Sequence, residues 1–166
     1  MKQLLFSLAL LVTISSCGQG SQQRKSPHDT VTYANGSVTY GRPYKHDRDI
    51  FGALVEYGKV WRLGADEATI ITFNTDTKFG DVMVPKGSYT LFALVNEKEW
   101  TFILNTQLGQ WGAFSYEKYK DKDIAKVTVP VDKLDKVVEQ LTIQFNAHNT
   151  MIVQWDTVQV TVPLSF

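Results

Sequence analysis

The sequence contains a single cysteine, Cys17, among its 166 residues. A disulfide within the chain is therefore impossible, and noncovalent packing must supply the stability of the fold. Because this cysteine lies close to the N-terminus, the remainder of the chain has no thiol. Catalysis by a cysteine nucleophile inside the folded domain is therefore excluded.

An excess of charge of one sign is also missing. Lysine plus arginine number 17 and aspartate plus glutamate number 17, so the formal net charge is +0 at pH 7. A protein that binds nucleic acid needs clustered positive charge to neutralise the phosphates. We therefore expect no nucleic-acid partner.

Recognisable metal and hydrolase motifs are absent as well. The three histidines are His28, His46 and His148, and none of them pairs at the short spacings that are typical of zinc sites. The chain also lacks the G-x-S-x-G sequence that surrounds the nucleophile of many hydrolases. We therefore expect neither a metal nor another cofactor.

The main apolar run is too short to span a membrane. It extends from Leu4 to Ile14 and has 11 residues, whereas a membrane-spanning helix needs about 20. This length, with Lys2 before it, is typical of a secretory signal peptide. The residues Ile14-Ser15-Ser16-Cys17 resemble the lipobox of bacterial lipoproteins. We therefore predict that residues 1–16 are a signal peptide and that Cys17 is lipidated.

The residues after Cys17 indicate where such a lipoprotein resides. Gly18 and Gln19 differ from the acidic residue that resembles an inner-membrane retention signal. We therefore expect a lipid anchor in the outer membrane, with the domain facing the periplasm. Residues 18–30 are polar and lack an apolar period, which indicates a flexible tether. The predicted organisation is a lipidated cysteine and tether over residues 17–30, followed by one domain over residues 31–166.

One modification site is predicted within this tether. Asp29-Thr30-Val31 resembles a short acceptor sequence for bacterial O-glycosylation. In a flexible segment a transferase could reach the Thr30 hydroxyl. Thr30 is therefore a candidate O-glycosylation site.

From Val31 onward, short segments alternate apolar and polar residues, which indicates β-strands. Asn35-Gly36 between two such segments is a strong hairpin signal. Residues 89–95 are expected to pair with residues 100–105. With about nine or ten such strands and no long helical period, the sequence predicts an all-β domain, an antiparallel two-sheet sandwich that resembles a jelly roll.

Further expectations concern the connections between strands. Residues 49–54 are expected to form one helical turn, and residues 132–138 a turn or a short helix. The segments 56–63 and 68–75 look extended. If the loop Gly64–Glu67 joins them in a hairpin, that loop lies at one rim of the sandwich.

Several motifs resemble a known family. The longest begins Tyr57-Gly-Lys-Val-Trp-Arg-Leu-Gly-Ala-Asp-Glu67 and continues to Asn74. Further motifs are Tyr40-Gly-Arg-Pro43, Val84-Pro-Lys-Gly-Ser-Tyr-Thr-Leu-Phe92, Glu99-Trp-Thr-Phe-Ile-Leu-Asn105, Gln110-Trp-Gly112, and Val153-Gln-Trp-Asp156 with Val162-Pro163. Together they resemble the domain-of-unknown-function 2911 family, which is found mainly in Bacteroidetes. The resemblance spans residues 31–166 and implies a secreted or lipid-anchored β-protein, but it implies no activity.

Aromatic and charged side chains supply the candidates for a binding site. An aromatic ring can stack on the apolar face of a ligand while polar neighbours fix the ligand's orientation. Trp111 lies in an irregular, glycine-flanked segment and is expected to be the most exposed ring. Trp100 and Trp155 are expected to point inward, and the alternative interpretation places all of the tryptophans in the core. The candidate ligand-binding residues are Arg42, Trp61, Arg62, Glu67, Trp111 and His148.

The pair Asp66-Glu67 is the candidate for acid–base chemistry. A carboxylate at the rim of the domain could act as an acid or a base if burial raised its pKa. The alternative is structural, with Arg62 pairing with Glu67 and clamping the turn. Of these two interpretations, the sequence favours the Arg62–Glu67 clamp over acid–base chemistry.

Three functional interpretations follow. The leading one is a lipid-anchored, non-enzymatic module that faces the periplasm and either binds a glycan or peptide or takes part in envelope assembly. The second is a hydrolase or isomerase that acts on glycans or peptides through rim residues near Glu67. The third is a structural envelope subunit with a protein partner. A pocket with exposed rings favours the first, a buried carboxylate in that pocket the second, and a large apolar patch the third.

Overall fold

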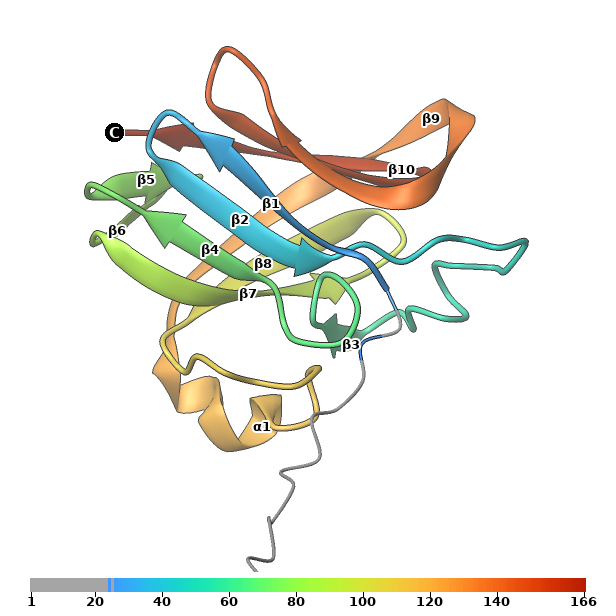
Figure 1. Cartoon of the computed structure of the whole chain (residues 1–166), viewed down its shortest axis with the longest axis horizontal. Helices are drawn as coiled ribbons and strands as arrows, with labels where there is room; N and C mark the ends of the chain where they lie inside the picture. The colour runs from blue at the N-terminus through green and yellow to red at the C-terminus, as the bar shows by residue number, and fades with distance from the viewer. Residues whose placement is uncertain (1–23, 25) are drawn as a thin grey trace, which may run out of the picture.

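The computed structural model describes Arg24 and residues 26–166, so the predicted signal peptide and Cys17 lie outside the described residues. Figure 1 shows that strands dominate the described chain, with one short helix, α1 (Tyr116–Tyr119), and one 3-10 turn, η1 (Lys120–Lys122). The strands are β1 (His28–Tyr33), β2 (Gly36–Gly41), β3 (Lys59–Trp61), β4 (Ile70–Phe73), β5 (Thr77–Phe79), β6 (Val82–Val84), β7 (Gly87–Val95), β8 (Glu99–Asn105), β9 (Asp123–Phe145) and β10 (Thr150–Ser165).

The strands form one antiparallel sheet. The hydrogen-bonded order is β1-β2-β4-β7-β8-β9-β10-β5-β6, and β3 pairs with β7 beside this path. Val95 opposes Trp100 in the β7–β8 hairpin, and Tyr33 opposes Gly36 in the β1–β2 hairpin. The predictions of an all-β antiparallel fold and of these two hairpins are therefore confirmed.

The long strand β9 carries this sheet from one layer of the fold to the other. Residues 123–130 of β9 pair with β8, whereas residues 131–145 pair with β10. In Figure 1 the β9–β10 hairpin, coloured orange and red, forms a layer beside β1 and β2. The sandwich is therefore one continuous sheet that folds over itself, rather than two separate sheets.

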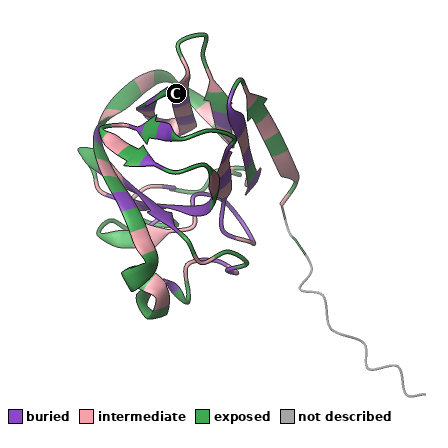
Figure 2. Cartoon of the chain, turned by 90° about the vertical axis from the view of Figure 1, so that its left-hand side faces the viewer, coloured by how far each residue is buried: buried purple, intermediate pink, exposed green. Residues whose placement is uncertain are grey.

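The core lies between these two layers. Tyr40 on β2 is 1% exposed, and its hydroxyl accepts a hydrogen bond of 2.8 Å from the backbone N–H of Ile143 on β9. Tyr33 stacks on Phe145 with their ring centroids 4.2 Å apart. In Figure 2 the buried residues lie along the inner strands, whereas the helical segment is largely exposed. Polar and aromatic contacts therefore join β1 and β2 to β9.

Two predicted connections are wrong, and one element was not predicted. Residues 49–54 form hydrogen-bonded turns, in which the N–H of Val55 donates to the carbonyl of Ile50, rather than a helical turn. Residues 132–138 continue β9, because their backbone pairs with β10 across register shifts on either side of Asp156. The short helix α1 carries no periodic signal in the sequence, because four residues are too few to show one.

Strand β1 begins at His28, whereas the sequence places the start of the domain at residue 31. Asp29 and Thr30 therefore belong to a strand and not to a tether. The N–H of Arg42 donates to the carbonyl of Pro27 at 2.7 Å and extends this contact by one residue. Strand β1 lies at the edge of the sheet, and its first three residues are polar. The sequence therefore shows no alternation of apolar and polar residues before Val31.

The expected hairpin between residues 56–63 and 68–75 does not form. Strand β3 pairs with residues 93–95 of β7, and β4 pairs with residues 87–90 of the same strand. Both strands therefore lie along one edge of β7, one after the other. The connection between them, residues 62–69, turns a corner at that edge.

Tyr40→Phe tests the hydrogen bond that joins the two layers. The ring still fits, but the buried N–H of Ile143 loses its acceptor, so we expect a loss of about 1–3 kcal/mol in the free energy of unfolding. Urea denaturation followed by tryptophan fluorescence measures this loss. Tyr57→Phe removes a hydroxyl from an exposed ring and serves as the control, with an expected change below about 0.5 kcal/mol. Equal stability of both variants would contradict a stabilising role for the hydrogen bond between Tyr40 and Ile143.

Candidate functional site

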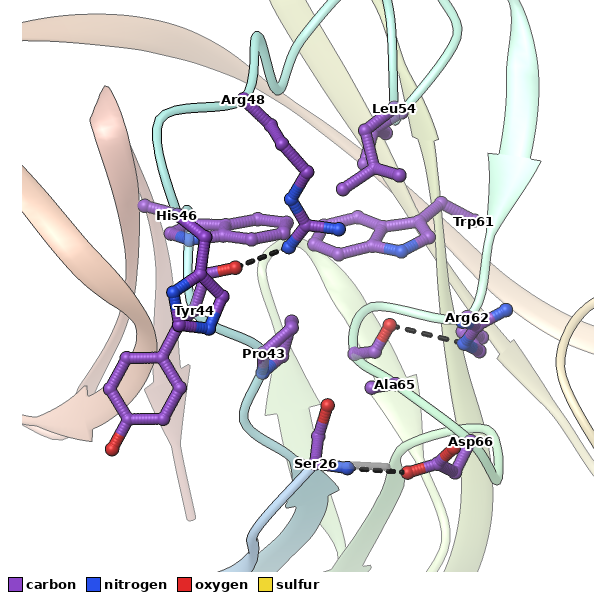
Figure 3. A pocket seen from close by; sticks show the side chains of 13 residues that line it. Ser26, Pro43, Tyr44, His46, Arg48, Leu54, Trp61, Arg62, Ala65 and Asp66 are labelled. Atoms are coloured by element: carbon purple, nitrogen blue, oxygen red, sulfur yellow. Dashed lines mark hydrogen bonds between the residues drawn. The ribbon is translucent and has the colours of Figure 1, made fainter. Parts of the chain in front are cut away.

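A pocket with a volume of about 390 Å³ lies where the β2–β3 connection, the corner after β3 and strand β10 meet (Figure 3). Its size falls near the lower end of the range for small-molecule sites. Aromatic, cationic and small side chains share the lining, together with one carboxylate. The residues that matter for its chemistry are Tyr44, His46, Arg48 and Leu54 from the connection, Trp61 from β3, Arg62 and Asp66 from the corner, Trp155 from β10, and Ser26.

Two indoles form the aromatic part of the pocket. Trp61 is partly exposed, whereas Trp155 is 1% exposed and donates its indole N–H to the carbonyl of Glu139 at 3.3 Å. The two rings are nearly parallel, with an interplanar angle of 15° and centroids 5.9 Å apart. Trp155 is therefore a core residue at the base of the pocket, and Trp61 offers an accessible ring.

The edges of two further rings hold Trp61 in place. Phe51 and Trp100 contact it in edge-to-face geometry, with centroids 6.4 Å and 6.0 Å from its own. Trp100 is 2% exposed. The prediction that Trp100 and Trp155 point inward is confirmed. A ring packed on several sides loses little freedom when a ligand stacks on it.

Arg62 is held at the lower wall of the pocket. Its Nε–H donates to the carbonyl of Gly64 at 3.1 Å, which fixes the plane of the guanidinium (Figure 3). Burial lowers the pKa of Arg62 from its ordinary value, and the negative charge of Asp66 opposes this shift. An arginine keeps its proton near pH 7 even after such a shift, so Arg62 remains a cation.

A second cation, Arg48, reaches the pocket from the opposite side. It donates to the backbone carbonyls of Tyr44 and Lys45, the latter at 2.9 Å. Arg48 lines the same pocket as Trp61, and Figure 3 shows the hydrogen bond that its guanidinium donates to the Tyr44 carbonyl. Both acceptors are neutral, so these bonds orient the side chain without neutralising its charge.

The β2–β3 connection is held against the edge of β9. The N–H of Lys45 donates to the carbonyl of Glu139 at 2.7 Å, and the N–H of His46 donates to the Glu139 carboxylate at 2.9 Å. The N–H of Leu141 donates to the carbonyl of Pro43 at 3.0 Å. These bonds give the connection a defined backbone, so Arg48 and its neighbours have a fixed place.

Glu67 is bound by the N-terminal segment and not by Arg62. Arg24 Nε donates to both carboxylate oxygens at 2.9 and 3.1 Å, and His28 Nε2 lies 3.0 Å from Oε2. The expected Arg62–Glu67 clamp is therefore wrong, since the hydrogen bond of Arg62 goes to Gly64. The hydrogen bond from Arg24 holds the pKa of Glu67 below its usual range.

The corner that carries Asp66 has an unusual backbone. Leu63 and Asp66 have φ angles of 53° and 63°, a region that residues other than glycine seldom adopt. Thr69 stabilises the corner by donating its N–H to the carbonyl of Arg62 and its hydroxyl to the carbonyl of Leu63. Asp66 in turn accepts the N–H of Ser26 at 3.2 Å. Strained conformations of this kind concentrate at functional sites.

The structure places the remaining candidate residues outside the pocket lining. Arg42 pairs with Asp29 at 3.0 Å and ties β1 to β9. Trp111 is partly exposed and pairs through its backbone with Glu67, beside the corner. His148 lies in the β9–β10 turn. Of the six predicted ligand-binding residues, the lining therefore brings together Trp61 and Arg62.

Thr30, the candidate O-glycosylation site, is exposed on β1. Its hydroxyl lies 2.9 Å from that of Thr39 on β2. The acceptor sequence is therefore presented on an edge strand and not within a flexible segment. Its modification stays a prediction.

Sequence reasoning missed the part of the pocket that comes from the β2–β3 connection. Tyr44, Arg48 and Leu54 lie far from Trp155 in sequence and meet it because the connection folds back across the sheet. The nearest sequence signal is the polar segment from Lys45 to Asp49, which carries no motif. The contact with β9 that positions it depends on the tertiary fold.

The family motifs identified in the sequence are distributed over this whole architecture. The sequence model of the family described as "Protein of unknown function (DUF2911)" matches residues 22–164, which is most of the chain. The chain belongs to the DUF2911 family. The match includes every strand from β1 to β9 and nearly all of β10. Neither the comparison with curated proteins nor that with solved structures found a match.

Two further properties of this DUF2911 domain concern the described residues alone. No helix among them has the length and apolar character that crossing a membrane requires. Within the same residues, no three His, Cys, Asp or Glu side chains gather in a way that could hold a metal ion.

Glu67→Gln tests the link between the N-terminal segment and the corner. Because its pKa is lowered in the folded state, Glu67 stabilises the protein above the ordinary pKa of 4.5, and this contribution is lost as the pH falls through the lowered value. We expect the variant to have a lower Tm than the wild type at pH 7. The difference in Tm between the two proteins should become smaller as the pH falls below about 4.

Differential scanning fluorimetry across this pH range measures the difference in Tm. Glu97→Gln removes an exposed carboxylate from the β7–β8 turn and serves as the control. We expect the control to melt with the wild type at pH 7. A Glu67→Gln protein that melts with the wild type at pH 7 would contradict the role of this ion pair.

Proposed function

We propose that this DUF2911 chain is a lipid-anchored module of the outer membrane that faces the periplasm and binds a small glycan or peptide in the pocket beside Trp61. Its leader and Cys17 have the sequence of a lipoprotein signal. The described domain has a pocket in which a partly exposed indole lies next to two cationic side chains. A binding module would account for both features, because the anchor would hold the domain at the membrane and the pocket would take the ligand.

The observation that carries this proposal is the setting of Trp61. Its ring is braced by Phe51 and Trp100, and it lines a pocket of about 390 Å³. A stacking surface with neighbouring hydrogen-bond donors suits ligands that have both an apolar face and polar groups. Sugars and short peptides have this character.

The state of Glu67 favours binding over acid–base catalysis. A general acid that works near pH 7 needs a carboxyl group with a raised pKa, as burial away from cations would give. The pKa of Glu67 is lowered instead, chiefly by the hydrogen bond from Arg24. Glu67 is thus held ionised and paired, which suits a structural role at the rim.

The anchor would keep the pocket close to the membrane. Six residues lie between Cys17 and Arg24, so a fully extended chain joins the two over at most about 25 Å. Arg24 contacts Glu67, and Ser26 lines the pocket. A ligand bound beside Trp61 would therefore lie near the surface to which Cys17 is attached.

Lipidation of Cys17 can be tested on the mature protein. We expect the protein extracted from membranes to begin at Cys17 and to carry the mass of two or three acyl chains, because stable anchoring requires more than one chain. Intact-mass spectrometry measures this directly. Cys17→Ala should yield a protein without acyl mass that leaves the membrane fraction. An unacylated wild-type protein that begins at another residue would end this part of the proposal.

The stacking role of Trp61 can be tested by titrating tryptophan fluorescence with peptidoglycan fragments, oligosaccharides and short peptides. We expect at least one of them to change the fluorescence. Trp61→Ala should weaken its binding by about tenfold or more, because the stacking surface is lost. Trp111→Ala removes a partly exposed indole outside the lining and should bind like the wild type. No response to the whole panel, or equal loss in both variants, would reject the proposal.

A further inference from the structure

The guanidinium of Arg62 has N–H donors that a ligand could engage. Of its five N–H donors, the one on Nε is engaged by the carbonyl of Gly64. Among the described residues, no carboxylate pairs with its two Nη groups. The side chain lines the pocket, and its Nη1 atom lies near Gly112.

The carboxylates near the pocket are already engaged by the N-terminal segment and its surroundings. Glu67 is held by Arg24 and contacted by His28. Asp66 accepts the N–H of Ser26 and has a further interaction. The negative charge of Asp66 still acts on Arg62, but no described residue accepts a hydrogen bond from the Nη groups of Arg62, so these donors remain for another acceptor.

The charge of the lining decides what kind of acceptor fits. Arg48 and Arg62 contribute two positive charges, and Asp66 contributes one negative charge. The excess of one positive charge suits a single negative charge better than two. A guanidinium with a free edge matches the two oxygens of a carboxylate in bidentate geometry.

We propose that the ligand of this pocket carries a single carboxylate group, which binds to the Nη edge of Arg62 while the apolar part of the same molecule stacks on Trp61. The proposal deepens the proposed function and rests on it, since it names the chemical class of the ligand. An acidic sugar or the C-terminal end of a short peptide has this chemistry. Arg48, which lines the same pocket, adds its positive charge.

Three small aromatic probes separate charge from shape. Benzoate and benzamide have the same ring and nearly the same outline, but benzoate carries a carboxylate. Phenyl phosphate presents the same ring with a doubly charged oxyanion. We expect the mature protein to bind benzoate about tenfold or more tightly than benzamide, because charge-assisted hydrogen bonds are stronger than neutral ones.

Two independent readouts follow the binding of each probe. Tryptophan fluorescence reports stacking on Trp61. The nitrogen-proton resonance of the Arg62 Nε group reports contact with the guanidinium, and its absence from the Arg62→Gln spectrum assigns it. Only benzoate should change both signals strongly.

Variants then test whether Arg62 is the group responsible. Arg62→Gln should bind benzoate and benzamide about equally, with the affinity for benzamide unchanged. Arg62→Lys keeps the charge but loses the fork, so it should retain part of the preference. Lys59→Gln removes one positive charge from an exposed position on β3, three residues before Arg62, and should keep the full preference.

The outcomes distinguish the two proposals. If benzoate and benzamide both change the fluorescence equally and leave the Arg62 resonance unmoved, the pocket binds ligands but the carboxylate assignment fails. If benzoate moves the Arg62 resonance without changing the fluorescence, the carboxylate assignment holds and the stacking role fails. A stronger response to phenyl phosphate overturns the choice of a single charge. Silence of every probe in both readouts overturns both proposals.

Discussion

The site depends on one cluster of aromatic rings that closes the fold between its two layers. Trp100 comes from β8, Trp155 from β10 and Trp61 from β3, and Phe51 comes from the β2–β3 connection. Such ring pairs contribute about 0.5–1.5 kcal/mol each beyond the area that they bury. Because the four rings come from four segments, their packing fixes the connection over the sheet and creates the wall of the pocket.

The charged groups of the site are arranged around this apolar support. The N-terminal segment carries Arg24 and His28 to Glu67, while the β2–β3 connection carries Arg48 to the pocket. The corner at Leu63 and Asp66 keeps its rare backbone conformation because Thr69 bonds to it on two sides. Glu67 is thereby neutralised by the N-terminal segment, whereas Arg48, Arg62 and Asp66 line the pocket and leave it with an excess of one positive charge. This excess supports the binding role proposed for the pocket.

Local patterns in the sequence predicted the local structure well. Asn35-Gly36 predicted the β1–β2 hairpin, although the turn residues are Ala34 and Asn35 and Gly36 already pairs with Tyr33. The burial of Trp100 and Trp155 follows from alternation in their strands. The failures at residues 132–138 and at Glu67 concern contacts between distant segments. Residues 132–138 look like a turn because they lie where β9 departs from its regular register with β10. The pairing of Glu67 with Arg24 joins residues 43 positions apart, and no local pattern encodes it.

By itself, the sequence determined the family, the all-β antiparallel character of the domain and two residues of the pocket lining, Trp61 and Arg62. These conclusions rest on period, turn chemistry and motif, which are properties of neighbouring residues. The tertiary structure decided that β3 and β4 share one edge of β7 and that the β2–β3 connection completes the pocket. It also decided that Glu67 is bound by the N-terminal segment. The completion of the pocket depends on the bend of β9, since only the folded-over sheet brings β10 and the connection to the same place.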